Sequence, residues 1–372
     1  MQSNLVIFPN AGAAKNSMQT EEGTITKYDR AEEQFIELLA MEDLDHQLDV
    51  KPAIASEFEQ ALSRAIRAAY KNDRFDEQAH RFLQRILYRI NRLKLFWYDD
   101  LRHYTNERSL YLCSCRDQIE AAWQKWELAQ LEDVAALQQL DVKQALIERT
   151  SADLDPLLSE SSRYIREEMT EAGYRHLLAI GSFDGLVEAS HLSRILGGVA
   201  NEVQCTLMRV LIEEYGNGRL SRKHSTFFAQ MLAEFGMNTE PEAYFDLVPW
   251  EVLASTNHNF LVTERKRYFL RYSGGLTYFE VAGPAVYKNY MMAAQRLGLS
   301  EVAVGYWELH IREDERHGRW MLDDVALPLA ERYLNDAWEL VLGYDQQKFM
   351  SDRAGGAVVR SIRKAEQAGW LI

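Results

Sequence analysis

Residues 306–322 read YWELHIREDERHGRWML, and this stretch predicts a helix with three polar side chains on one face. It contains no proline, a single glycine (Gly318) and mostly strong helix formers. His310, Asp314 and His317 stand at positions i, i+4 and i+7, so in a helix they point the same way. Apolar neighbours indicate that this face looks inward. Two imidazoles and a carboxylate are costly to bury unpaired, and a metal ion would satisfy all three.

The spacing of the two histidines favours a pair of ions over one. At a rise of ~1.5 Å per residue, their α-carbons lie on the order of 10 Å apart. That distance is wide for one ion, but it suits two ions roughly 4 Å apart with one histidine toward each. The alternative is a solvated charged face with incidental histidines, because Arg312, Glu313, Glu315 and Arg316 surround the three residues.

Length and composition narrow the class of protein. The chain has 372 residues, enough for two domains of ordinary size. Its net charge of −14 argues against a nucleic-acid surface and against binding to anionic lipid. The three cysteines form no CxxC pair, which favours a reducing compartment. The apolar run at residues 5–8 is too short for a signal peptide or a membrane span, so we expect a cytoplasmic protein without membrane contact.

The hydrophobic pattern predicts an all-α chain in four parts. Residues 1–27 form a flexible lead-in, residues 28–150 a helical region for dimerisation or docking, residues 151–350 a second helical block, and residues 351–372 a tail. Helices in the second block are expected at about 159–179, 182–196, 199–215, 221–235, 247–272, 274–297, 300–322 and 327–345. Gly355 and Gly356 predict a break before a short basic helix.

The first half holds three histidines without ligand spacing. His46, His80 and His103 each follow an acidic residue by three or four positions. Solvated pairs on helix surfaces are the preferred interpretation.

Further carboxylates and one histidine complete a candidate constellation. The tight connection after Glu214 can fold two helices back on each other and bring Glu214 near His224, although Glu213 is its equal by composition. Glu188 and Glu280 stand in apolar surroundings, where a lone carboxylate needs a partner, and Glu188 could instead pair with Arg194 or His191. Carboxylates mixed with neutral imidazoles suit iron or manganese. Spacing alone could not have picked this set from the 56 acidic residues.

Four stretches carry a family resemblance: LVEASHLSRILGG (186–198), LIEEYGNGRLSRKHSTFFAQML (211–232), FLRYSGGLTYFE (269–280) and ELHIREDERHGR (308–319). Over about residues 155–335 the sequence resembles the haem-oxygenase-like diiron oxidases and oxygenases. Both the E-Y-G-x-G-x5-H and the H-x3-D-x2-H elements occur in the expected order. The resemblance implies a helical bundle of that fold after an N-terminal helical region. The metal ligands that it implies are Glu188, Glu214, His224, Glu280, His310, Asp314 and His317.

The resemblance also implies a function. It implies a homodimer with two Fe(II) per chain that uses O2, an external electron donor and a small amino-acid-derived substrate of natural product biosynthesis. Glu280 matches an additional carboxylate of the N-oxygenating branch, so N-oxygenation is expected with Glu280 as a catalytic residue. The sequence carries no C-terminal cupin domain, so the rearrangement that such a domain performs is not expected.

Several alternatives stay open at this point. The same diiron site could perform oxidative C–C cleavage, carbon excision or desaturation. A metal-free helical binding protein would make the histidines incidental. Haem binding is disfavoured, because His176 and His191 are the only candidates near the start of such a fold. Arg271 could hold a substrate carboxylate or could pair with an acidic residue.

Overall fold

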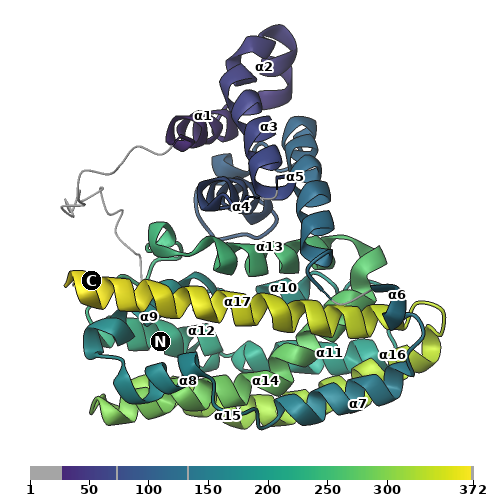
Figure 1. The fold of residues 1–372 in the computed structure, drawn as a ribbon, viewed down its shortest axis with the longest axis vertical. Helices are drawn as coiled ribbons and strands as arrows, with labels where there is room; N and C mark the ends of the chain where they lie inside the picture. The colour runs from purple at the N-terminus through teal and green to yellow at the C-terminus, as the bar shows by residue number, and fades with distance from the viewer. Residues whose placement is uncertain (1–26, 73, 132–133, 370–372) are drawn as a thin grey trace, which may run out of the picture.

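The structure is a computed structural model that describes residues 27–369 except residues 73, 132 and 133 (Figure 1). Within this part of the chain every regular element is a helix, which confirms the all-α prediction. The predicted lead-in lies outside the described residues, apart from Lys27. None of the described helices combines the length and the apolarity needed to cross a bilayer.

The N-terminal helices form the upper part of the molecule in Figure 1. They are α1 (Asp29–Leu39), α2 (Leu44–Val50), α3 (Ser56–Tyr70), α4 (Glu77–Arg92) and α5 (Leu110–Leu128). Their apolar faces meet in one core, in which Phe35, Phe58 and Trp123 are completely buried. The apolar spacing in the sequence is thus the spacing of the packed faces.

The helices of the second half form a bundle below them. They are α6 (Val134–Leu137), α7 (Val142–Asp153), α8 (Glu160–Arg163), α9 (Glu171–Gly185), α10 (Ser190–Ser193), α11 (Glu202–Glu214), α12 (His224–Glu234), α13 (Trp250–Glu264), α14 (Phe269–Arg296), α15 (Glu301–Trp320), α16 (Leu327–Arg332) and α17 (Trp338–Ala368). The N-terminal core also contains Trp250 of α13 and Met350 of α17, so the two parts share buried surface. Figure 1 shows α13 directly beneath the N-terminal helices, with the long α17 running across the bundle.

Glycines set how closely the central helices pack. A Cβ at Gly274 of α14 would lie 1.9 Å from the carbonyl oxygen of Leu340, and one at Gly343 of α17 would lie 1.9 Å from that of Arg271. On the other side of α14, a Cβ at Gly318 of α15 would lie 2.9 Å from the carbonyl oxygen of Glu280. These positions accept no larger side chain without a shift of backbone. The backbones of α14, α15 and α17 therefore touch, and this contact positions the polar residues described below.

Several predicted helix boundaries are wrong. The predicted helices at 159–179 and 327–345 are interrupted, at residues 169–170 and 333–337, where the chain leaves the helical conformation. The predicted helix at 182–196 is interrupted, because α9 ends at Gly185 and a turn follows before α10. The break expected near residue 273 occurs at residues 265–268, and α14 runs through its glycines, where close packing requires them. The predicted break at Gly355 and Gly356 is absent, and α17 continues through the predicted tail to Ala368. Burial of Val359 and Ile362 against the bundle holds this last part helical.

The structure places the N-terminal histidines in different environments. His103 is exposed and lies 3.1 Å from Asp99, as a solvated pair should. The same prediction is wrong for His80, which is completely buried. Its ring centroid lies 4.5 to 5.1 Å from those of four aromatic residues, Tyr70, Phe75, Trp126 and Trp250. His80 is therefore part of the contact between the N-terminal helices and α13.

Candidate metal centre

The inward face predicted for α15 is confirmed. The exposed fractions of His310, Asp314 and His317 are 4%, 5% and 0%. The helix begins where the side chain of Ser300 accepts hydrogen bonds from the backbone N–H groups of Val302 and Ala303. The other predicted residues come from four further segments: Glu188 from the turn after α9, Glu214 from the end of α11, His224 from the start of α12 and Glu280 from the middle of α14.

The connection from α11 to α12 turns back as the sequence predicts. Gly216 and Asn217 both have positive φ, 61° and 54°. A Cβ at Gly216 would lie 2.4 Å from the carbonyl carbon of Arg222, so only glycine fits there. The turn brings Oε2 of Glu214 within 2.9 Å of Nδ1 of His224.

A first cluster contains Glu188, His224 and His310. Each residue contributes one ligand atom, and these atoms lie within 4.8 Å of one another. Oε2 of Glu188 lies 3.3 Å from Nε2 of His310, and the two imidazole rings are 4.6 Å apart. The hydroxyl of Tyr306 donates a hydrogen bond of 2.9 Å to the same oxygen of Glu188. Nδ1 of His310 lies 3.0 Å from the backbone carbonyl oxygen of Tyr306, which directs Nε2 toward the cluster.

A second cluster contains Glu214, Asp314 and His317, again with ligand atoms within 4.8 Å of one another. Nδ1 of His317 lies 3.5 Å from Oε1 of Glu214 and 3.4 Å from Oε2 of Glu280. Because the other oxygen of Glu214 faces His224, this carboxylate lies between the two clusters. The structure therefore brings all seven predicted residues to one place.

The donor set fits a cation-binding site. The buried Oε1 of Glu188 and Nδ1 of His317 have no hydrogen-bond partner among the described residues. Unpaired buried polar atoms are costly, and coordination to a metal ion would satisfy them. Three imidazoles and four carboxylates make a mixed N and O set, which suits iron or manganese.

The electrostatics also favour positive charge at this place. Burial alone would lower the pKa of His310, but the adjacent Glu188, Asp314 and Glu214 raise it to about 10. Burial likewise opposes protonation of His317, but Glu280, Glu214 and Glu213 raise its pKa to about 9. In Asp314, burial and the neighbouring Glu280 raise the pKa well above the usual range. The carboxylates thus repel one another unless a cation lies among them.

A cavity of about 140 Å³ adjoins both clusters. Five of the seven candidate ligands line it: Glu188, Glu214, Glu280, His310 and Asp314. The remaining lining is Asp184, Ala189, His191, Leu192, Asn259, Tyr272, Leu276, Phe279 and Tyr287. A small molecule in this cavity would contact the carboxylates directly.

Sequence reasoning left some neighbours of the site undecided or missed them. Glu213 and Glu214 could not be ranked by composition, and the structure directs Glu214 toward both clusters and Glu213 to the far side of His317. Asp184 was missed: it lies near the end of α9, four residues before Glu188, and both line the cavity. Arg271 pairs with Glu339 at 2.6 Å, so acidic pairing is the observed alternative for that residue.

Comparison with known proteins agrees with this geometry. Residues 175–344 match the model of a family described as iron-containing redox enzymes, of the haem-oxygenase-like type. The chain is also similar to nitrosourea synthase from Streptomyces achromogenes subsp. streptozoticus, with 25% identity over 189 residues. That alignment covers 50% of this chain, and the chain spans 39% of the length of that relative. The predicted haem-oxygenase-like bundle after an N-terminal helical region is confirmed.

Proposed function

We propose, from the premise that residues 175–344 form an iron-containing redox enzyme domain, that the chain is a non-haem diiron oxygenase or oxidase of small-molecule biosynthesis. The leading reaction is N-oxygenation of an amino-acid-derived substrate. One observation carries the proposal: two three-residue clusters of ligand type lie side by side, and Glu214 of the second contacts His224 of the first. Two adjacent ions with one carboxylate between them is the arrangement expected of a dinuclear site.

The ligand assignment follows from the distances. Glu188, His224 and His310 would hold one ion, and Asp314, His317 and Glu280 the other, with Glu214 between them. Two Fe(II) ions in these places would supply electrons and open positions for O2. Four carboxylates match the charge of two divalent ions, so the filled centre is close to neutral.

The chain's own residues orient the ligands and the substrate. The hydroxyl of Tyr306 donates a hydrogen bond to Glu188 and so fixes one carboxylate oxygen. Glu280 lies within 3.4 Å of His317 and also lines the cavity, and we assign it the catalytic role because it borders both. Phe279, Leu276 and Tyr287 form an apolar part of the cavity lining.

The cavity favours a small substrate with a cationic nitrogen. Its lining contains neither lysine nor arginine. Four of its five carboxylates are the proposed metal ligands, so Asp184 is the one that remains for a substrate. Asp184 makes no side-chain hydrogen bond or ion pair with the described part of the chain, so its carboxylate is available for an ammonium or guanidinium group. N-oxygenation of such a substrate takes one O2, two electrons from an external donor and two protons, and it yields an N–OH product and water.

Metal binding tests the core of the proposal. Metal-free protein is titrated anaerobically with Fe(II), and we expect two ions per chain and a higher melting temperature. His310→Ala and His317→Ala should each lower the number of Fe(II) ions bound. His103→Ala should not, because His103 is an exposed histidine of the N-terminal region. Wild-type protein that binds no iron and melts at the same temperature with and without it would favour a metal-free helical binding protein instead.

Isotope labelling tests the reaction. Turnover of amino acids and their amine derivatives under ¹⁸O2 is followed by mass spectrometry. N-oxygenation places the label on nitrogen, desaturation leaves none in the product, and C–C cleavage or carbon excision changes the carbon count. A product with no labelled nitrogen would replace N-oxygenation by one of these reactions of the same site.

We also propose a homodimer formed through the N-terminal helices. Phe96, Tyr98 and Leu101 lie in the connection between α4 and α5, and each exposes 48% or more of its surface. Burial of such residues favours association. Light scattering after size exclusion should give twice the chain mass of 43.1 kDa, and Tyr98→Asp should reduce it.

A further inference from the structure

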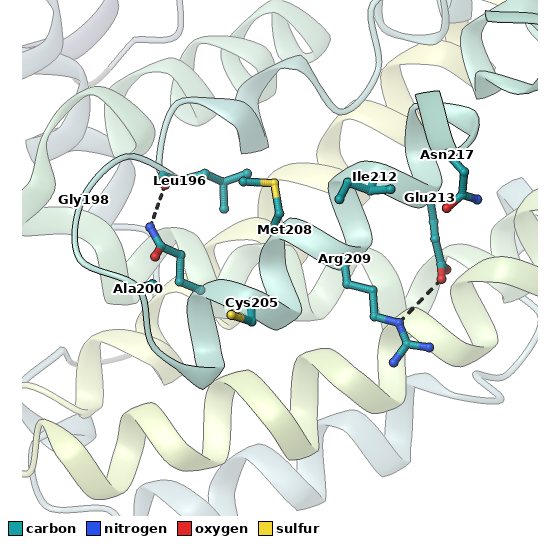
Figure 2. Close-up of a pocket in the computed structure, with 10 residues that line it drawn as sticks. Leu196, Gly198, Ala200, Cys205, Met208, Arg209, Ile212, Glu213 and Asn217 are labelled. Atoms are coloured by element: carbon teal, nitrogen blue, oxygen red, sulfur yellow. Dashed lines mark hydrogen bonds and ion pairs between the residues drawn. The ribbon is translucent and has the colours of Figure 1, made fainter. Parts of the chain in front are cut away.

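Glu213 stands next to Glu214 in the sequence, but its side chain takes a different direction. It lines a surface groove of about 480 Å³ along α11, where Figure 2 shows it facing Arg209 of the same helix. On its other side, Oε2 of Glu213 lies 3.0 Å from Nε2 of His317. One carboxylate therefore connects the groove to a candidate metal ligand that is itself completely buried.

The imidazole of His317 has carboxylates on both sides. Its Nδ1 faces Glu214 and Asp314 of the second cluster and the adjacent Glu280, and its Nε2 faces Glu213. Nε2 is within hydrogen-bond distance of Glu213, whereas Nδ1 has no hydrogen-bond partner among the described residues. An ionised carboxylate accepts a hydrogen bond and cannot donate one, so the proton of the neutral imidazole belongs on Nε2. The lone pair then lies on Nδ1, the atom that faces the second cluster.

His310 provides the comparison within the same site. The ring nitrogen of His310 that faces away from its cluster contacts the uncharged backbone carbonyl of Tyr306 at 3.0 Å. The corresponding nitrogen of His317 contacts the charged carboxylate of Glu213. A charged acceptor makes an imidazole a stronger metal donor than a neutral acceptor does. The two clusters therefore differ in the strength of their histidine ligands.

Two arginines keep Glu213 in its role as acceptor. Arg316 donates a hydrogen bond of 2.5 Å to it, and Arg209 lies 3.7 Å away. Both guanidinium groups lie over the ring of Trp320, at 3.7 Å for Arg209 and 5.1 Å for Arg316. Burial would raise the pKa of Glu213, but the hydrogen bonds from His317 and Arg316 outweigh it and lower the pKa.

A third metal ion is the competing explanation for this carboxylate. Glu213, Glu313 and His317 do place ligand atoms within 4.8 Å of one another. However, the guanidinium of Arg316 contacts both glutamates. Positive charge is thus already present between them, and a further cation would have to displace it.

We propose that Glu213 is a positioning residue that keeps His317 protonated on Nε2 and directs Nδ1 at the second cluster, so that the ion held there binds more tightly. This inference rests on the proposed function, since it requires that the second cluster binds an ion.

Metal titration of single variants tests it. Metal-free protein is titrated anaerobically with Fe(II) and, separately, with Co(II). Loss of such an outer carboxylate typically weakens metal binding by about 10- to 100-fold. We expect that weakening for Glu213→Ala at one of the two ions only, with a smaller loss for Glu213→Gln, whose amide oxygen still accepts the proton. Glu313→Gln is the matched control, because Glu313 pairs with Arg316 and makes no hydrogen bond to His317 in the described structure.

A spectroscopic readout separates positioning from a merely structural effect. In the Co(II)-loaded protein, the Nε2 proton of His317 should give a hyperfine-shifted, exchangeable NMR signal that exchanges slowly. Glu213→Ala should lose that signal, and Glu313→Gln should keep it. Circular dichroism melting checks that each variant is folded.

The outcomes are distinguishable. Wild-type protein that binds two ions while Glu213→Ala binds both with unchanged affinity and keeps the signal would overturn the role of Glu213 alone. If Glu213→Ala weakened the binding of both ions equally, the role of Glu213 would also be overturned. Wild-type protein that binds no ion would overturn this inference together with the proposed function.

Discussion

Replacing Gly318 by alanine should push apart the two helices that carry the candidate centre. The added Cβ would lie 2.9 Å from the carbonyl oxygen of Glu280 and 3.3 Å from Cα of Val281. Ordinary contacts begin near 3.4 Å, so α14 and α15 must separate by a few tenths of an ångström. The obstacle is backbone, which cannot rotate out of the way. Overpacking of this kind costs about 1–3 kcal/mol of the free energy of unfolding.

The same shift should reach the candidate ligands. Glu280 of α14 faces His317 of α15 across 3.4 Å, and Gly318 is the next residue along α15. Separation of the helices lengthens this distance. We therefore expect Gly318→Ala to weaken the binding of one Fe(II) as well as to lower the stability of the metal-free protein.

Gly305 offers a control on the same helix. A Cβ there meets no atom within 4 Å. Removing a glycine from a helix interior in open space stabilises by about 0.5–1 kcal/mol. The free energy of unfolding of the metal-free protein, measured in urea by circular dichroism, should therefore fall for Gly318→Ala and rise for Gly305→Ala. Equal stabilisation by both alanines, with iron binding unchanged, would refute the reasoning from helix contact.

Three further outcomes follow from contacts described above. Burial, together with the charge of Arg353, lowers the pKa of His80 from 6.5 to about 4. The neutral imidazole therefore stabilises the fold above pH 6.5, and this contribution is lost as the pH falls toward 4. His80→Phe should remove about 3 kcal/mol of this acid sensitivity in urea unfolding curves measured across that range; an unchanged slope would contradict it. Glu339→Gln should cost about 3 kcal/mol in the same assay at pH 7, because it leaves the buried Arg271 without a charged partner; a loss near zero would mean that water or another group replaces the pair. Ser300→Ala should cost about 1 kcal/mol by removing the cap of α15, and Ser300→Asp should restore most of it.

The sequence predicted the parts of the site that depend on local geometry. The face of α15 follows from a 3.6-residue period, and the approach of Glu214 to His224 follows from a turn with three positive φ angles. Glu188 and Glu280 were candidates only by their apolar surroundings, and the family resemblance implied that they are ligands, because no spacing rule connects a turn after α9 with the middle of α14. That these residues bind iron stays a prediction, as do the domain boundaries and the homodimer.

The errors have a common physical cause. His80 has the local pattern of a surface residue, but α13, far along the chain, covers it with Trp250. Gly355 and Gly356 have the local pattern of a break, but packing of Val359 and Ile362 extends the helix. Contacts between distant segments overrode local preference in each case. The contact of Glu213 with His317 is of the same kind.

The candidate ligands lie on five segments between residue 188 and residue 317, and no segment carries a complete cluster. A ribosome makes the first of these carboxylates long before the last imidazole, so the nascent chain has no place for an ion until most of the bundle has emerged. Capture of the metal would then come at the end of biogenesis, and the metal content of a preparation would report the fraction of molecules that had matured.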